Sequence, residues 1–269
     1  MAITALHSAA TGLSALSTNL DIIANNLANV NTTAFKAQRA NFEDLMYQQK
    51  ALPGVENASG DQRPGGLQVG MGTKISNTQY DFATGSPIVT DRQLDLFIQG
   101  QGFFQVTTLA EGGSSVGYTR AGNFFRNSNG EMVLGNADGL KLDPAITVPQ
   151  DATQIDVTAD GTVFAHVPGS TTPTNLGRLQ LANFVNPQGL KSAGGNVYME
   201  TAASGPPIQG NPGDSNFGTI QQNALESSNV DPVRELVSLI KTQRAFEMNS
   251  QTIQSADQAL QVVSNLRRG

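Results

Sequence analysis

Apolar side chains repeat every seven residues at both ends of this 269-residue chain. The N-terminal repeat is Leu6, Leu13, Leu20 and Leu27, with a second column of Ala9, Leu16, Ile23 and Val30. The C-terminal repeat is Leu239, Phe246, Ile253 and Leu260. Columns three or four residues apart share one face of a helix, and a sustained seven-residue period is typical of a coiled coil. Each end of the chain is therefore predicted to be one long helix.

The helix limits and the need for a partner also follow from the sequence. Proline is absent before Pro53, and Asp231 followed by Pro232 is a favourable start for the C-terminal helix. Ordering so long a helix costs more conformational entropy than burial of its apolar side chains returns. The terminal helices must therefore pair with each other, with other subunits, or with both.

The middle of the chain has the pattern of short strands. Residues 94–106, LDLFIQGQGFFQV, contain two apolar runs separated by Gly100 and Gly102. Asn129-Gly130, Asp138-Gly139 and Asp160-Gly161 are hairpin turn signals between alternating segments. This pattern predicts a central antiparallel β domain, and the fold class is expected to be α+β.

Two stretches rich in Gly and Pro, residues 51–72 and 204–219, are predicted to be irregular. The expected organisation combines residues 1–45 and 225–269 in a coiled-coil core domain. An extended stretch, 46–72, leads to the β domain at 73–224.

Composition excludes several classes of function. The chain has no Cys, two His and a formal net charge of −6. Disulfides and thiolate metal sites are impossible, and an acidic chain does not bind nucleic acid by charge alone. Gly100-Gln-Gly102 lacks the third glycine of a dinucleotide fingerprint, and the central aspartates fit no calcium loop. We expect no catalytic residue, cofactor, metal or small-molecule substrate. No secretory signal peptide is recognisable at the N-terminus.

Three motifs resemble the flagellar basal-body rod protein family. They are NLDIIANNLANVNTTAFK at 19–36, the central LDLFIQGQGFFQV with YTRAGNF and NGEMVLGNADGLKL, and ESSNVDPVRELVSLIKTQRAFEMNSQTIQSADQALQ at 226–261. The motif positions singled out are Asn25, Asn26, Leu27, Asn29, Asn31, Phe35, Lys36, Gln243, Arg244 and Asn249. Ala34 and Asn223 stand where the family pattern commonly has Gly. The asparagines form either a solvated helix face or hydrogen bonds between subunits.

The resemblance implies a structural role. The terminal helices would form an antiparallel coiled coil lining a helical tube, with the β domain outside. The tube would be the distal rod, a rigid hollow drive shaft that crosses the periplasm in the basal body. Implied partners are other copies of the chain, proximal rod proteins, hook protein, P-ring and L-ring proteins, and the type III export apparatus, which would export the chain without a cleaved signal.

The segment from Phe42 to Gly72 resembles the long stretch that marks distal rod subunits. Six of its residues are the candidates for stiffening the rod: Leu52, Pro53, Val55, Pro64, Leu67 and Val69. Two alternatives remain. One is a proximal rod subunit with a β domain, and the other is a secreted β-type adhesin or binding module with helical flanks. A secreted enzyme would need a cluster of acids, bases or nucleophiles, which the sequence does not offer.

Overall fold

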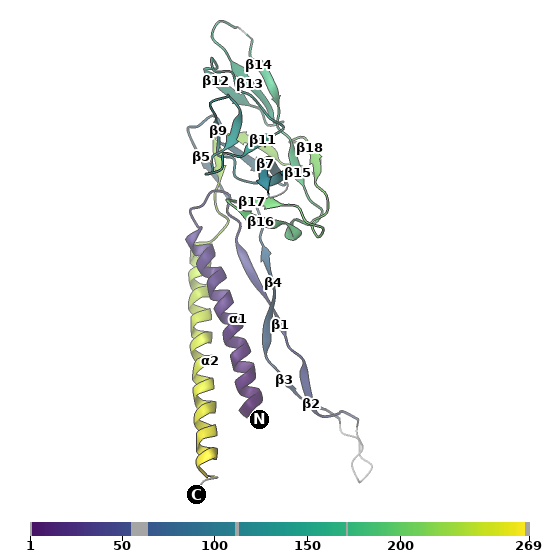
Figure 1. Cartoon of the computed structure of the whole chain (residues 1–269), viewed down its shortest axis with the longest axis vertical. Helices are drawn as coiled ribbons and strands as arrows, with labels where there is room; N and C mark the ends of the chain where they lie inside the picture. Colours follow the sequence, from purple (N-terminus) through teal and green to yellow (C-terminus); the bar gives the residue numbers. More distant parts are fainter. Residues whose placement is uncertain (1, 55–63, 111–112, 171, 267–269) are drawn as a thin grey trace. The chain divides into compact units, whose positions relative to one another are not determined.

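The computed structural model describes residues 2–54, 64–110, 113–170 and 172–266. A long helix lies at each end of the sequence and short antiparallel strands occupy the middle, so the fold class is α+β (Figure 1). Packing divides the chain into two compact units. The first unit holds Met1–Ala28, Gln38–Tyr80 and Asp231–Gly269, and the second holds Asn29–Ala37 and Asp81–Val230.

Both predicted helices are present: α1 spans Ala2–Ala28 and α2 spans Pro232–Leu266. α2 begins as predicted, because Asp231 Oδ1 accepts the backbone N–H groups of Val233 at 3.0 Å and Arg234 at 3.2 Å. Neither helix, over the residues described, is long and apolar enough to cross a lipid bilayer.

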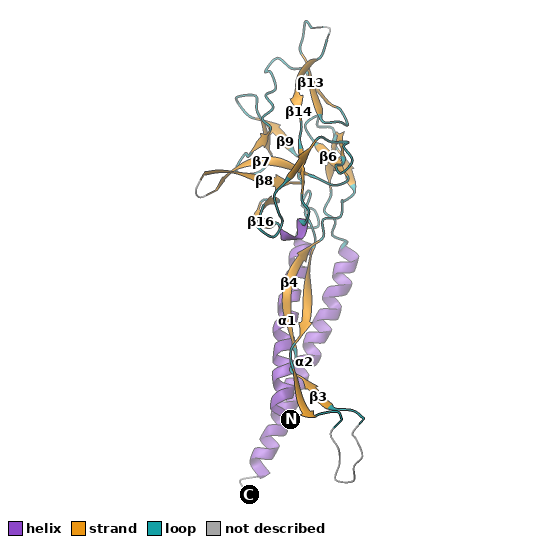
Figure 2. Cartoon of the chain, turned by 90° about the vertical axis from the view of Figure 1, so that its right-hand side faces the viewer, coloured by secondary structure: helices purple, strands orange, loops and turns teal. Residues whose placement is uncertain are grey.

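Strands complete the first unit. They are β1 (Gln38–Asp44), β2 (Tyr47–Ala51), β3 (Leu67–Gly70) and β4 (Thr73–Tyr80). β1 pairs antiparallel with β4 and β2 with β3, so both arms of one long hairpin are hydrogen-bonded (Figure 2). The stretch 46–72 is predicted from the sequence to be extended, and residues 51–72 to be irregular. The pairing of β2 with β3 corrects the second prediction at Ala51 and at Leu67–Gly70. Cross-strand backbone hydrogen bonds order these polar segments without the apolar alternation that would have revealed them.

The hairpin packs closely on α1. Ser8 Oγ donates to the carbonyl of Gly70 at 3.3 Å, and the N–H of Thr73 donates to Thr11 Oγ1 at 3.4 Å. Gly72 lies between these contacts with a φ of 112°, and a Cβ there would overlap Thr11 Oγ1. Glycine at 72 therefore permits both the turn and the close approach to the helix.

The second unit is built on a nine-stranded antiparallel sheet. Its main path runs β16-β17-β8-β7-β11-β10-β9, and β15 joins β7 to β18. These strands are β7 (Phe103–Ala110), β8 (Gly113–Thr119), β9 (Phe124–Arg126), β10 (Met132–Leu134), β11 (Lys141–Asp143), β15 (Leu181–Asn183), β16 (Lys191–Gly194), β17 (Val197–Met199) and β18 (Ile208–Gly210). Smaller sheets join β12 (Gln154–Val157), β13 (Thr162–His166) and β14 (Thr174–Arg178); β6 (Leu96–Gln99) and β19 (Thr219–Gln222); and β5 (Pro87–Val89) and β20 (Ala224–Glu226). A 3₁₀ turn covers Pro187–Gly189.

The predicted turns in this unit are confirmed. Asn129-Gly130 joins β9 to β10, Asp138-Gly139 joins β10 to β11, and Asp160-Gly161 joins β12 to β13. All three strand pairs are antiparallel, as hairpins require.

The core of the second unit draws on a segment outside the predicted β domain. Phe104 and Phe124 are buried with perpendicular rings whose centroids lie 5.2 Å apart. Ala34, from the segment after α1, is buried in the same core. Residues 29–37 and 225–230 thus belong to the second unit, whereas β4 belongs to the first. Local sequence patterns do not show this division, because it depends on pairing between residues far apart in the chain.

Two residues that stand where the family pattern commonly has glycine adopt left-handed backbone conformations. Ala34 has a φ of 58° and Asn223 a φ of 59°. Asparagine tolerates this region better than alanine, because its short polar side chain can hydrogen-bond locally. Asn223 is exposed, so the backbone dominates the effect of changing it.

We predict that Asn223→Ala lowers the free energy of unfolding by about 1 kcal/mol, because Ala pays the steric penalty of positive φ. Asn223→Gly is the matched control and should leave stability nearly unchanged. Urea denaturation of the purified chain measures both variants. Equal stability of the alanine variant and the parent would show that φ at 223 is not constrained.

Candidate assembly surfaces

α1 and α2 are joined by polar contacts at seven-residue intervals. Asn26 Nδ2 donates to Glu235 Oε1 at 3.2 Å, and Asn19 Nδ2 donates to Thr242 Oγ1 at 3.1 Å. One repeat further, a Cβ on Gly12 would lie 3.1 Å from Asn249 Nδ2. Positions rise along α1 as they fall along α2, so the helices are antiparallel. Small and amide side chains at these positions let the two backbones approach closely.

The predicted apolar columns lie beside this polar column with graded burial. Ile23 is buried. The half-buried members within the helices are Leu6, Leu13, Leu16, Leu20, Leu27, Leu239 and Ile253. Val30 was predicted to continue the N-terminal column, but it lies after the end of α1, in a turn of the second unit. Phe246 and Leu260 each remain 37% exposed. The helix pair therefore covers its own apolar columns only in part.

Asn26 ties α1 to two other elements of the first unit. Its Oδ1 accepts the N–H of Gln38 at 2.9 Å, and its Nδ2 donates to the carbonyl of Gln38 at 2.7 Å as well as to Glu235. Burial raises the pKa of the Glu235 carboxyl, and the bond from Asn26 acts in the opposite direction. Asn26 thus forms its hydrogen bonds within one chain. The two alternatives expected for the motif asparagines were exposure to solvent and hydrogen bonds between subunits.

The other motif residues divide between exposed and buried positions. Asn25, Asn31, Gln243 and Arg244 are exposed, and Arg244 Nη1 lies 3.1 Å from Glu247 Oε2. Leu27, Asn29, Phe35 and Asn249 are half-buried, and Lys36 is buried.

We predict that Asn26→Ala destabilises the first unit by about 2 kcal/mol, because it leaves the polar groups of Gln38 without their partner. Asn31→Ala, at an exposed position of the same motif, should change stability by less than about 0.5 kcal/mol. Chemical denaturation followed by helix circular dichroism compares the two. A similar loss in both variants would contradict the role assigned to Asn26.

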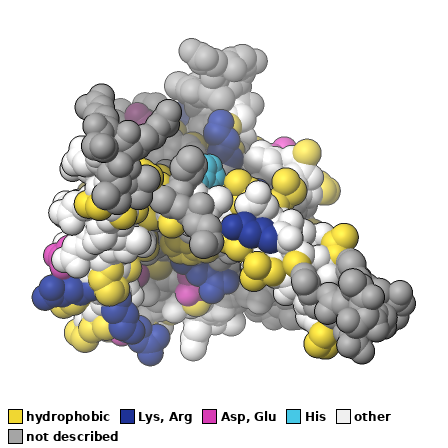
Figure 3. Space-filling model, turned by 90° about the horizontal axis from the view of Figure 1, so that it is seen from below, with side chains coloured by type: hydrophobic (Ala, Val, Ile, Leu, Met, Phe, Trp, Pro, Cys, Tyr) yellow, Lys and Arg dark blue, Asp and Glu magenta, His cyan; other side chains and the backbone are white. Residues whose placement is uncertain are grey.

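Sequence reasoning missed a second apolar surface on α2. Four side chains, 45–68% exposed, make up what we call the outer face of α2: Val233, Leu236, Val237 and Ile240. Leu236 and Val237 are adjacent, and each is three or four residues from Val233 and from Ile240, so the four lie on one side of the helix. Ile240 is displaced about 200° around the helix from Thr242, which contacts α1. Their spacing in the sequence could have predicted this face. The seven-residue repeat that starts at Leu239 drew attention to a different face of the same helix. In the space-filling view, apolar side chains also reach the surface among Lys and Arg (Figure 3).

The candidate stiffening residues lie in or beside the β2–β3 hairpin. Leu52 and Leu67 are 55% and 56% exposed, Pro53 and Pro64 are exposed, and Val69 is half-buried. Val55 lies outside the described residues. Met46 and Tyr47, which sequence reasoning passed over, add exposed apolar surface to the same arm.

A buried charge cluster lies in the second unit. The Glu226 carboxylate is 2.6 Å from Lys36 Nζ and 2.9 Å from Arg120 Nε. The side chains of Lys36 and Glu226 are 0% exposed and that of Arg120 is 3% exposed. Burial lowers the pKa of Lys36, and Glu226 acts in the opposite direction. Arg120 and Glu226 lay inside two of the motifs, YTRAGNF and the C-terminal run, but were given no role.

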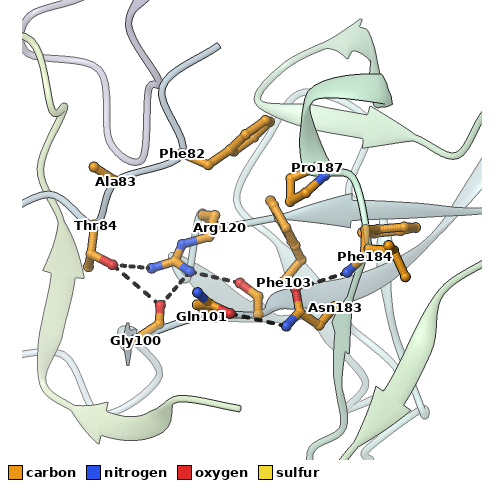
Figure 4. Close-up of a pocket in the computed structure, with 12 residues that line it drawn as sticks. Phe82, Ala83, Thr84, Gly100, Gln101, Phe103, Arg120, Asn183, Phe184 and Pro187 are labelled. Carbon is orange, nitrogen blue, oxygen red and sulfur yellow. Dashed lines mark hydrogen bonds between the residues drawn. The ribbon is translucent and has the colours of Figure 1, made fainter. Parts of the chain in front are cut away.

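A cavity of about 510 Å³ adjoins Arg120 (Figure 4). Phe82, Phe103 and Phe184 contribute to its apolar wall. The guanidinium donates to the carbonyls of Ile98, Gly100 and Gly102, to Thr84 Oγ1 and to Glu226. These bonds use all five of its N–H groups, so Arg120 is a structural cation and not an anion receptor. Among the residues described, no three His, Asp or Glu side chains are grouped to hold a metal ion.

Comparison with known families gives three matches along the chain. Residues 6–36 match the family described as "Flagella basal body rod protein". Residues 97–165 match "Flagellar hook protein FlgE/F/G D1 domain", and residues 221–266 match "Flagellar basal body rod FlgEFG protein C-terminal".

Whole-length similarity to individual proteins agrees with these matches. The chain is 45% identical over 264 residues to "Flagellar basal-body rod protein FlgG" of Caulobacter vibrioides, covering 98% of this chain and 99% of that protein. It is 42% identical over 266 residues to the protein of the same name from Borreliella burgdorferi, covering 98% of each. It is 33% identical over 272 residues to "Flagellar hook-basal body complex protein FlhP" of Bacillus subtilis, covering 96% of this chain and 97% of that protein.

Proposed function

The chain belongs to the family of flagellar basal-body rod proteins and is a structural subunit of the flagellar rod, and we propose that its copies polymerise into the hollow shaft of the distal rod. In this role the chain transmits torque to the hook and surrounds an export channel. Full-length similarity to proteins named FlgG supports this role over a secreted adhesin or binding module. It also favours the distal over the proximal rod.

The outer face of α2 is the observation that carries the proposal of polymerisation. Covering a large apolar side chain stabilises by roughly 1.5–3 kcal/mol, and this face presents four that are largely exposed. A second copy that covers them gains a large part of this free energy. A contact between unlike surfaces of successive copies extends into a helical polymer when the rotation does not close a ring.

The polar contacts between α1 and α2 support an antiparallel coiled coil as the core of each subunit. Their seven-residue step is the coiled-coil period. Partly covered residues such as Phe246 and Leu260 are then available to neighbouring copies. The same helices would hold the subunit together and join it to the polymer.

The proposed partners follow from this position in the flagellum. Proximal rod proteins contact one end of the polymer and hook protein the other. P-ring and L-ring proteins surround it, and the type III export apparatus delivers the chain to the basal body.

We predict that Ile240→Asp prevents rod formation, because the polymer would have to bury an unpaired charge. Helix content and stability of the purified monomer should stay unchanged, since Ile240 is exposed there. Gln251→Asp, an exposed position further along α2, is the control and should support normal rods. Electron microscopy of basal bodies from complemented cells decides, and normal rods with Ile240→Asp would exclude the outer face as an interface.

The β2–β3 hairpin is proposed to stiffen the rod by lying against a neighbouring subunit. Its exposed Met46, Tyr47, Leu52 and Leu67 are suitable anchors. Over the described residues its sheet has two strands, and the edges of such a sheet can form further hydrogen bonds. In a polymer, a neighbouring subunit would cover the apolar anchors and hydrogen-bond to the strand edges.

Deleting residues 53–66 is expected to leave the second unit folded while giving a flexible tube or no stable rod. The deletion joins Leu52 directly to Leu67 and leaves too short a connection to close the pairing of β2 with β3 at Ala51 and Leu67. Microscopy of basal bodies from the deletion strain measures this. Straight rods of normal stiffness would show that the stretch is only a linker.

A further inference from the structure

Glu226 connects three segments of the second unit. Its Oε1 accepts from Lys36 Nζ at 2.6 Å and from the N–H of Gly85 at 2.8 Å, and its Oε2 accepts from Arg120 Nε at 2.9 Å. Lys36 Nζ also donates to the carbonyl of Ala83 at 2.6 Å, and the N–H of Ala34 donates to the backbone carbonyl of Glu226 at 2.8 Å. Residues 34–36, 83–85 and 226 are thus held at one point.

Asn229 joins the same segments a second time. Its Oδ1 accepts the N–H of Ala37 at 2.7 Å, and its Nδ2 donates to the carbonyl of Asp81 at 2.7 Å. Its own N–H donates to the carbonyl of Phe35 at 3.3 Å. Two sets of side-chain hydrogen bonds therefore hold these segments together. One set is made by the buried carboxylate of Glu226, and the other by the amide of Asn229.

These segments lie close in sequence to the places where the chain passes from one unit to the other. The chain passes between the two units at residues 28/29, 37/38, 80/81 and 230/231. The fastened segments, 34–37, 81–85 and 226–229, lie next to three of these four passages. Force transmitted along the backbone from the first unit enters the second unit beside these segments at three of the four passages.

We propose that Lys36, Arg120 and Glu226 form a mechanical clasp, which keeps these segments from peeling away from the β-rich unit when force is applied to the terminal helices. In the flagellum this force is the torque of the rod, so the physiological role rests on the proposed function. The clasp itself is a property of the single chain. Two cations share one carboxylate, so Glu226 is the member whose loss leaves the largest uncompensated charge.

The charge that each variant leaves unpaired predicts how much faster its clasp opens. Glu226→Gln leaves two buried cations without a counter-charge, and we expect the rate at which the clasp opens to rise about 100-fold or more. Lys36→Met leaves Arg120 paired with Glu226, and we expect a rise of about tenfold. Glu131→Gln is the control. It breaks the more exposed pair with Lys141, 2.9 Å long, in the same unit and should change nothing at the clasp.

Single-molecule pulling tests the mechanical claim on the full chain. The sequence has no Cys, so Asn31→Cys and Val233→Cys introduce two unique handles on either side of the clasp. At a fixed force, the opening rate should rise in the order control, Lys36→Met, Glu226→Gln. Equal opening rates in all three would overturn the proposal. The assay uses single chains, so a failure of rod assembly would not affect its result.

Hydrogen exchange separates peeling from general unfolding. In Lys36→Met, the amides of Ala34, Ala37 and Asn229 should exchange faster, while those of Phe104 and Val106 in β7 stay protected. The same separation is expected in Glu226→Gln. If Glu226→Gln unfolds the whole unit, the test rests on Lys36→Met alone. Unchanged exchange at the amides of Ala34, Ala37 and Asn229 in Lys36→Met would overturn the proposal.

Discussion

The incomplete coverage of the two terminal helices is the constraint on which the rest of the structure depends. α1 contacts α2 along a column made by Gly12, Asn19 and Asn26, and it also hydrogen-bonds to β1 and β4. α2 packs against α1, and its outer face stays exposed. A chain built in this way has apolar surface that a second copy can cover. We propose that self-assembly follows from how the helices pair.

The sequence predicted the elements whose signal is local. The two terminal helices, the Asp231 cap and the three Gly-containing turns each depend on residues close together in the chain, and each appears where expected. The contact column between the helices was harder to predict. It is made by Gly12, Asn19 and Asn26, one position before the leucines, because small side chains allow closer approach than leucine does.

Features that depend on distant residues could not be predicted from the sequence. The pairing of β2 with β3 involves polar strands with no clear alternation, and the two strands are well separated in the sequence. The clasp joins Lys36, Arg120 and Glu226, which are separated by 84 and 106 positions. All three lay in recognised motifs, but a motif does not state which of its charges will be buried together. The left-handed φ at Ala34 and Asn223 is an intermediate case. The glycine common in the family pattern suggests such a conformation, but alanine at 34 argued against it.

The most direct test of the account is the accessibility of the outer face of α2 before and after assembly. The chain has no Cys, so Val237→Cys gives one thiol at a position that is 46% exposed in the single chain. Its rate of reaction with a maleimide is measured in the purified monomer and in isolated basal bodies. The account predicts rapid labelling of the monomer and strong protection in the rod. Equal labelling in both would contradict the claim that this face joins the subunits.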